Sequence, residues 1–190
     1  MNAAINSDKW CDGNGNLLLS DPSLSGIQYS VVTDLAVEPV TLADFKLHAR
    51  IDYNTDDTLC EMYLKAARQH LEGWSQKSFG AKTIKLTALN LPKNYRLMFG
   101  PIAAISDPVD TYTTVGDILK DGPYEDVGIT YTTAWAVPDI IKAAICRYAA
   151  GLYSQRENLI FSVNGVPHEP EKLMDEAMKM VLPYANVAFL

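Results

Sequence analysis

The histidines of this chain are the first residues whose chemistry could support catalysis or metal binding. His48, His70 and His168 lie far apart in the sequence, and no pair has the HxxxH spacing that places two imidazoles on one helical face. His70 falls on the apolar side of a helical pattern, where we expect it to pack rather than to act as a general base. The histidines therefore predict neither a metal centre nor a catalytic base.

A polar loop near the start of the chain resembles part of a calcium-binding loop. Asp12, Asn14 and Asn16 occupy its first, third and fifth positions, but Leu17 stands where that loop requires glycine and Ser23 where it requires glutamate. The chain also lacks a Walker phosphate-binding loop, a GxGxxG motif and a GxSxG nucleophile elbow. The sequence therefore predicts a non-enzymatic protein that binds no cofactor and no metal.

Three cysteines, Cys11, Cys60 and Cys146, form an odd set without any CxxC spacing. Cys60 and Cys146 fall in helical patterns and are expected to be buried thiols, as in a reducing cytosol. Residues 1–10 lack the basic and then apolar pattern of a signal peptide. No apolar run approaches the roughly 20 residues that span a bilayer. We therefore expect synthesis in a cytoplasm and no membrane partner.

The charge balance of the chain opposes a role in gripping DNA. It carries 16 basic and 23 acidic side chains, a net charge of −7, so it is poorly suited to gather phosphates by releasing counterions. A short and a long helical pattern over 41–74 could suggest a helix-turn-helix, but the longer pattern begins with Asp56 and Asp57. Carboxylates at the start of a recognition helix would face phosphates, so we expect a packed helical pair instead.

Apolar periodicity shows which elements must position these side chains. It predicts helices over about 41–51, 56–75, 138–157 and 170–182. Thr41 precedes the first helix with Asp44 three residues later, as in a capping box, and Pro138 opens the third. A small antiparallel β section is predicted over about 80–133, where apolar and polar residues alternate around 84–88, 95–99 and 127–133.

Both ends of the chain are predicted to be extended arms around one domain. Residues 1–35 form the first arm: the first 26 are rich in Asn, Ser, Asp and Gly, although 26–34 has strand composition. Residues 184–190 form the second arm, because Pro183 stops the last helix. The single domain over 36–183 is predicted to be α+β and mainly helical, with an antiparallel helical core and an inserted β section.

The helices at 56–75 and 138–157 are predicted to pack antiparallel against each other. Both have long apolar faces, and no other predicted helix has a similar length to cover them. Their expected shared core consists of Leu59, Met62, Tyr63, Leu71, Ile141, Ile145, Tyr148 and Leu152.

Two blocks of sequence resemble one protein family. The first runs Glu38-Pro-Val-Thr-Leu-Ala-Asp-Phe-Lys46, followed by Asp56-Asp57, Ala66-Ala67-Arg68 and Leu71-Glu72-Gly-Trp74. The second runs Val137-Pro-Asp-Ile-Ile-Lys142 and ends Leu152-Tyr-Ser-Gln-Arg-Glu157. Their order and spacing, with the β section between them, are similar to the head–tail connector (adaptor) proteins of long-tailed double-stranded DNA bacteriophages.

The resemblance implies a structural role in the virion neck. Such proteins form a ring, typically a dodecamer, below the portal protein, where they extend the DNA channel and dock the stopper or tail-tube protein. Genomic DNA would pass through the lumen without specific binding. The main alternative is a DNA-packaging recognition protein such as a small terminase subunit, which would need a basic helix or arm. An enzyme with an unrecognised site is a third.

Residues 107–126 carry one base, Lys120, and a group of acids: Asp107, Asp110, Asp117, Asp121, Glu125 and Asp126. A solvated loop would explain this composition equally well. Under the resemblance, the segment would line or rim the channel or face the tail, because carboxylates there repel the DNA backbone.

The second arm carries large apolar side chains and no charged one. Tyr184, Val187, Phe189 and Leu190 would be a liability if they were exposed on a free subunit. We expect them to dock on the portal or on a neighbouring subunit. The alternative is a tail that folds back onto its own domain.

Overall fold

The structure is a computed structural model that describes residues 26–108, 111–155, 162–163, 166–167 and 170–185. Its helices are α1 (Leu42–Ala49), α2 (Asp57–Ser75), α3 (Asp139–Gln155) and α4 (Pro170–Val181), the last followed by the 3-10 turn η3 (Leu182–Tyr184). A four-stranded antiparallel sheet has the order β1-β2-β6-β3 and contains β1 (Gln28–Thr33), β2 (Thr83–Asn90), β6 (Glu125–Thr133) and β3 (Ile102–Asp107). Two small hairpins pair β4 (Thr113–Val115) with β5 (Ile118–Asp121), and β7 (Ser162–Val163) with β8 (Val166–Pro167).

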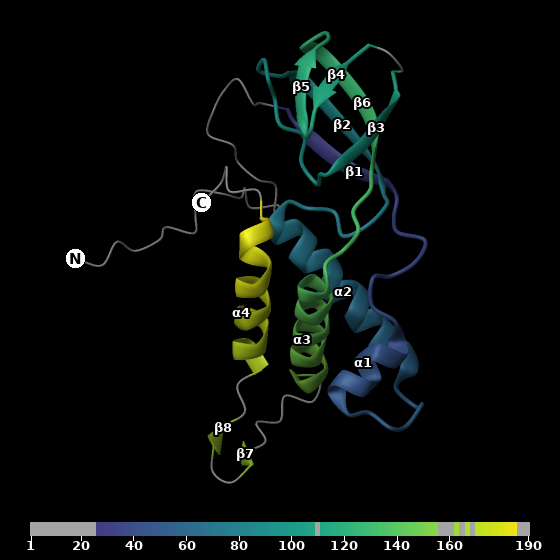
Figure 1. The fold of residues 1–190 in the computed structure, drawn as a ribbon, viewed down its shortest axis with the longest axis vertical. Helices are drawn as coiled ribbons and strands as arrows, with labels where there is room; N and C mark the ends of the chain where they lie inside the picture. Colours follow the sequence, from purple (N-terminus) through teal and green to yellow (C-terminus); the bar gives the residue numbers. More distant parts are fainter. Residues whose placement is uncertain (1–25, 109–110, 156–161, 164–165, 168–169, 186–190) are drawn as a thin grey trace, which may run out of the picture.

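The molecule has a helical part and a β part, stacked end to end along its long axis (Figure 1). Each part has its own hydrophobic core of buried side chains. In the helical part α3 lies between α2 and α4, and the sheet lies beyond the end of α2 (Figure 1). The fold is therefore α+β, with strands β2 to β6 between α2 and α3 as predicted and β1 added from before α1.

The predicted cap of the first helix is confirmed. The backbone N–H of Asp44 donates to Oγ1 of Thr41 over 3.1 Å, and the Thr41 hydroxyl donates back to the Asp44 carboxylate over 2.6 Å. The helix ends where Arg50 adopts a left-handed conformation with φ of 55°. The N–H of Ile51 then bonds to the carbonyl of Lys46, which satisfies one of the last carbonyls of the helix.

Helices α2 and α3 run antiparallel. The ring of Tyr63 meets that of Tyr153 at 6.3 Å, whereas His70, later in α2, stacks at 4.9 Å on Tyr148, earlier in α3. His70 thus contacts α3 through Tyr148, although it remains exposed. On the other side of α3, helix α4 buries Ala177 against the same core.

Most of the side chains expected between α2 and α3 are buried or partly buried, but Met62 is not. Leu71, Ile141, Ile145 and Tyr148 are buried, and Leu59, Tyr63 and Leu152 are partly buried. Met62 is 54% exposed, so its placement in this core is wrong. The buried stripe of α2 passes through Cys60 and Leu64. Because each residue turns the helix by about 100°, Met62 faces away from both.

Replacing Ile145 by aspartate is expected to lower the free energy of unfolding by several kcal/mol, because the substitution places an unpaired charge in a buried site. Replacing Met62 by aspartate puts the same charge on an exposed face of the same pair of helices, so we expect a change within about 0.5 kcal/mol. Urea unfolding followed by circular dichroism measures both. Equal losses for the two variants would contradict this assignment of the core.

Two of the three predicted strands are confirmed in the β section. Ile84, Leu86 and Ala88 of β2 are buried on one face of the sheet, beside the buried alternate residues of β6. The predicted strand at 95–99 is wrong, since its pairing is limited to an isolated bridge from Arg96 to Ile118. Asn94 and Phe99, with φ of 60° and 58°, bend the backbone at either side of this stretch.

The strand composition at 26–34, within the segment 1–35 that was predicted to be flexible or extended, is confirmed by β1. Gln28–Thr33, placed within an arm over 1–35, pairs with β2 as the edge strand of the sheet. Its alternating residues reflect this pairing, and the ordered domain therefore begins before residue 36. The rest of that arm, residues 1–25, lies outside the described residues.

Candidate functional site

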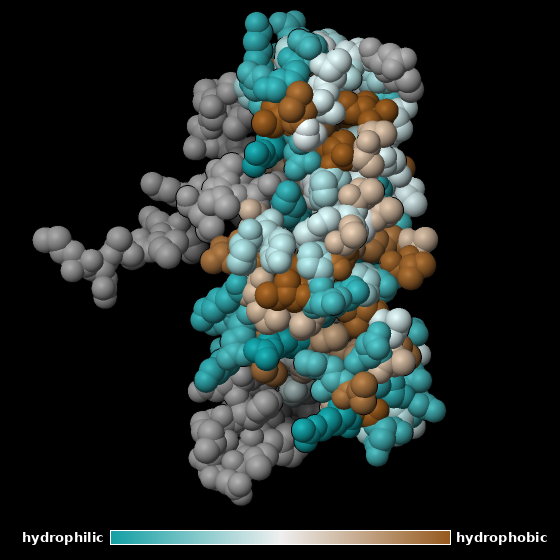
Figure 2. All heavy atoms as spheres, viewed as in Figure 1, coloured by the Kyte–Doolittle hydropathy of each residue, from teal (hydrophilic) through white to brown (hydrophobic). Residues whose placement is uncertain are grey.

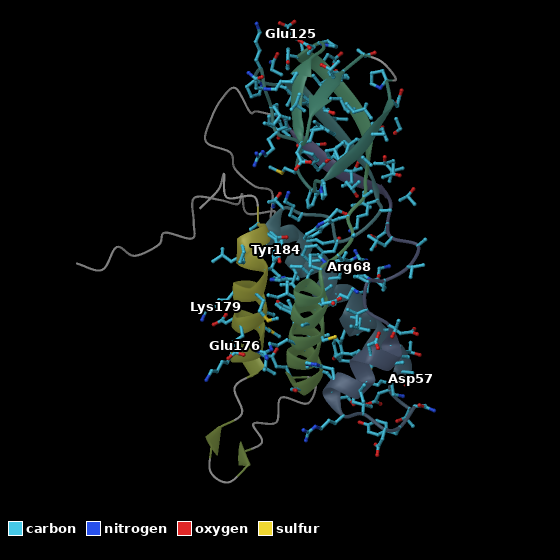
Figure 3. All side chains as sticks on the ribbon, in the orientation of Figure 1. Asp57, Arg68, Glu125, Glu176, Lys179 and Tyr184 are labelled. Carbon is cyan, nitrogen blue, oxygen red and sulfur yellow. The ribbon has the colours of Figure 1, made fainter. Side chains whose placement is uncertain are left out.

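Three segments connect the helical part to the β part, over residues 34–41, 76–82 and 134–138. Five charged side chains meet where the first two segments pass the end of α2, and we call them the junction network: Asp34, Glu38, Arg68, Glu72 and Lys82. Arg68 lies at the level where the helices meet these connections (Figure 3).

Arg68 is the centre of the junction network, and its side chain is fully buried. Its Nη1 and Nη2 atoms donate to the two carboxylate oxygens of Asp34, over 3.2 and 2.9 Å. Nε and Nη2 donate to Glu38 over 2.6 and 3.0 Å, and Nη1 donates to Glu72 over 2.8 Å. A guanidinium has five N–H donors, so this set matches its whole hydrogen-bonding capacity.

Lys82 and Glu72 extend the network to the start of the sheet. The Lys82 ammonium contacts Glu72 and lies 3.1 Å from Asp34. The other Glu72 oxygen accepts the backbone N–H of Phe79 over 2.7 Å. Glu72 therefore ties α2 to the chain that leads into β2, and Asp34 ties β1 to both.

The environment of Asp34 favours its charged form. Burial by itself would raise the pKa of this carboxyl, but hydrogen bonds from Arg68, the Leu35 backbone and Lys82 hold the pKa well below its usual range. Burial likewise opposes the charge of Arg68, and its bonds to Glu38 and Asp34 outweigh that effect, so the pKa of Arg68 lies above its usual range. Asp34 and Arg68 are therefore both charged at neutral pH.

Glu38, Arg68 and Glu72 lie in the sequence blocks that carry the resemblance, but their contact with one another was not predicted. One signal was available: Arg68 lies four residues after Leu64 and three before Leu71, on the buried stripe of α2. An arginine on an apolar stripe requires carboxylates from elsewhere in the chain. The sequence does not show which carboxylates these are.

A second polar contact lies between the β4–β5 hairpin and the same junction. Asp117 was predicted to line or rim a channel, but its side chain is only 16% exposed. It accepts the backbone N–H of Ile102 over 2.9 Å and pairs with Lys77 over 3.4 Å. A Cβ atom at Gly100 would lie 2.3 Å from this carboxylate, so glycine permits the close approach. Asp117 therefore has a structural role, and its assignment to an exposed acidic surface is wrong.

Replacing Asp117 by alanine is expected to cost about 1–3 kcal/mol of folding free energy, because the Ile102 N–H and the Lys77 ammonium each lose a partner. Glu125→Ala is the matched control, since Glu125 is exposed and should change stability by less than about 0.5 kcal/mol. Thermal unfolding of the two variants compares them directly. An Asp117→Ala protein as stable as the control would contradict the structural role.

The other described acidic residues of this segment are exposed: Asp107, Asp121, Glu125 and Asp126. Glu125 lies at the end of the β part farthest from the helices (Figure 3). Asp121 accepts a hydrogen bond from the hydroxyl of Thr113 across the β4–β5 hairpin, over 2.9 Å. Asp110 lies outside the described residues. The exposed carboxylates thus belong to the β part, away from the buried network.

Tyr184 was predicted to belong to a docking arm, but it packs on its own domain. It ends η3, and its ring lies 5.9 Å from that of Trp135 on the third connection. Tyr184 is partly exposed, and its contact with Trp135 anchors the start of the segment that was predicted to dock. Val187, Phe189 and Leu190 lie outside the described residues.

Residues 39–184 match the family described as phage gp6-like head-tail connector protein. The chain belongs to this family. The match covers most of the 190 residues and both parts of the fold, and head–tail connectors are structural proteins rather than a class of enzymes. A search of curated proteins gives no match.

The fold of this connector is similar to chains in solved particles of a gene transfer agent (GTA). A chain in the virion of the native particle has a TM-score of 0.62 and 19% identity, covering 78% of this connector and 94% of that chain. A chain in the neck of the empty particle, computed with C6 symmetry, has a TM-score of 0.61 and 19% identity, covering 79% of this connector and 94% of that chain. A chain in the neck of the native particle, computed with C12 symmetry, has a TM-score of 0.56 and 20% identity, again covering 79% of this connector and 94% of that chain. At these identities the similarity shows a shared fold.

The family match begins inside the junction. It includes Arg68, Glu72 and Lys82, whereas Glu38 immediately precedes its first residue and Asp34 lies four positions earlier still. Strand β1 also lies before it. In this connector, residues outside the matched region therefore complete the shell of carboxylates around Arg68.

The part of the connector that the structure describes contains no cluster of three or more His, Cys, Asp or Glu side chains suited to a metal ion. Cys60 and Cys146 are buried, as predicted, and burial raises the pKa of the Cys146 thiol to about 11. Among the described helices, none combines the length and apolar character needed to cross a membrane.

Proposed function

We propose that this connector forms a ring below the portal, extends the DNA channel and docks the stopper or tail-tube protein. The observation that carries this proposal is the family match over 39–184, which spans the helical part, the junction and the β part. The similar GTA chains come from necks computed with C6 and C12 symmetry, and both symmetries are compatible with a ring of twelve subunits. We therefore propose a dodecamer, assembled from subunits made in the host cytoplasm.

The exposed acidic end of the β part is proposed to face the lumen or the tail. Glu125 lies at that end, and Asp107, Asp121 and Asp126 are also exposed on the β part. A ring multiplies this negative charge by its symmetry, and like charges repel the DNA backbone. DNA would then slide through the lumen without specific binding.

The residues after Tyr184 are proposed to dock on the portal or on a neighbouring subunit. Tyr184 is fixed to Trp135, so this segment leaves the domain from a defined point near the junction. Val187, Phe189 and Leu190 supply its large apolar side chains. Burial of such groups is the usual source of affinity in an assembly interface.

Restoring the connector to particles that lack it tests this function. Disrupting its gene should yield filled heads without tails, and adding the purified protein should allow those heads to accept tails. DNA packaging should proceed in its absence. Empty heads, together with a gel shift of duplex DNA by the purified protein, would instead indicate the DNA-packaging recognition role.

A further inference from the structure

An open apolar groove lies at the junction and is lined by all three connecting segments. It has a volume of about 560 Å³, and its walls include Leu35, Val37, Pro39, Phe79, Trp135 and Val137. Apolar side chains reach the surface at mid-height on the right of the molecule, where Figure 1 places the connection from β1 to α1 (Figure 2). The groove thus borders the segment that the junction network holds in place.

The chemistry of the groove suits an apolar and uncharged occupant. Val37 on its wall is 79% exposed, so it offers apolar surface to an occupant of the groove. Lys142 is the charged residue that lines the groove. The Lys142 ammonium already pairs with Asp139 over 3.0 Å, so the occupant of the groove does not need to carry a negative charge.

We propose that residues 186–190 of the same subunit occupy this groove before assembly. Trp135 lines the groove and also contacts Tyr184, so the segment starts beside one of its walls. The segment, Asn-Val-Ala-Phe-Leu, has three large apolar side chains and no charged one, which matches the lining. Five residues span at most roughly 17 Å when extended, enough to cross a groove of this size.

Attachment to the same chain favours this occupant over a separate partner. A short tether raises the local concentration of the segment to about the millimolar range, so a weak apolar contact suffices. Because the same side chains are proposed to dock during assembly, the groove would keep them covered on the free subunit and release them to a competing partner. The occupancy itself does not depend on the docking proposal, since it concerns the free subunit alone.

Photocrosslinking from position 189 tests the proposal on the full-length protein. Phe189 is replaced by p-benzoylphenylalanine, a photoreactive analogue of similar shape, and the free protein is irradiated at several dilutions. The expected products are crosslinks within one chain to residues 35–39, 79–81 or 135–137, with a yield that does not change on dilution. Val37→Asp should abolish them, because it places a charge on the wall of the groove.

Val115→Asp is the matched control, since Val115 is also an exposed valine, at 65%, but lies on the β4–β5 hairpin. It should leave the crosslinks unchanged. Crosslinks between chains that fade on dilution, crosslinks to another surface, or none at all would overturn the proposal. So would groove crosslinks that survive Val37→Asp. None of these results would bear on whether the connector forms a ring.

Discussion

Replacing Arg68 by leucine is expected to lower the free energy of unfolding by about 3–5 kcal/mol, because the buried Glu72 and the partly exposed Asp34 and Glu38 lose their main partner. Leucine suits the buried stripe of α2, so the loss would come from the charge rather than from the packing. Asp34 and Glu72 would keep their contacts with Lys82, whereas Glu38 would lose both hydrogen bonds from Arg68. Urea unfolding followed by circular dichroism at neutral pH measures this loss.

The control for this prediction is Arg147→Leu, which also breaks an arginine–carboxylate pair. Arg147 and its partner Glu176 are 40% and 37% exposed, so this change should cost less than about 1 kcal/mol.

The two variants should also differ in their dependence on pH. The pKa of Asp34 is lowered in the folded protein, so its contribution is present above the unfolded value of about 3.9 and is lost as the pH falls below it.

The difference between the parent and Arg68→Leu should therefore shrink below about pH 4, where the Asp34 carboxyl becomes protonated in the unfolded chain. The difference for Arg147→Leu should stay small throughout. An Arg68→Leu protein within about 1 kcal/mol of the parent at neutral pH would show that the network does not hold the two parts together.

Replacing both Phe189 and Leu190 by serine is expected to abolish attachment of the connector to filled heads. Each apolar side chain could contribute roughly 1.5–3 kcal/mol when it is fully buried, before the entropy of ordering the segment is subtracted. The ring repeats this contact in every subunit, so a small loss per subunit becomes a large loss for the assembly. Immunoblots of purified heads measure how much connector they have acquired.

The matched control is Val115→Ser, which removes an exposed apolar side chain from the β4–β5 hairpin. It should leave attachment unchanged, and both variants should keep the circular dichroism spectrum of the parent. If heads acquire the doubly substituted protein and then accept tails at the normal rate, these residues are not the docking element.

Local signals in the sequence were sufficient for the helices but not for the sites. The Thr41 cap and the apolar face of α3 depend on residues a few positions apart, so the helix boundaries could be predicted closely. The alternation at 95–99 was misleading, because Leu97 is buried within a loop that hydrogen-bonds to the β4–β5 hairpin and is not part of a strand. An alternation of apolar and polar residues indicates which side chains are buried, but it does not show that the segment pairs with another strand.

The junction network and the position of Asp117 depend on contacts between distant residues. Asp34 is 34 positions from Arg68, and Asp117 is 40 from Lys77. Composition marked Asp117 as one acid among several, although its surroundings make it an internal hydrogen-bond acceptor. The family resemblance supplied the connector role, because its two motifs are ordinary amphipathic helices whose order and spacing carry the information.

A cryo-electron microscopy map of the neck in assembled particles tests the central claim most directly. The account predicts a ring of this chain, twelve subunits in number, between the portal and the stopper or tail tube, with Glu125 of each subunit facing the lumen or the tail. A ring with Glu125 on its outer perimeter would contradict the proposed role of the acidic end. A neck without this chain, or this chain located elsewhere in the particle, would contradict the proposed position below the portal.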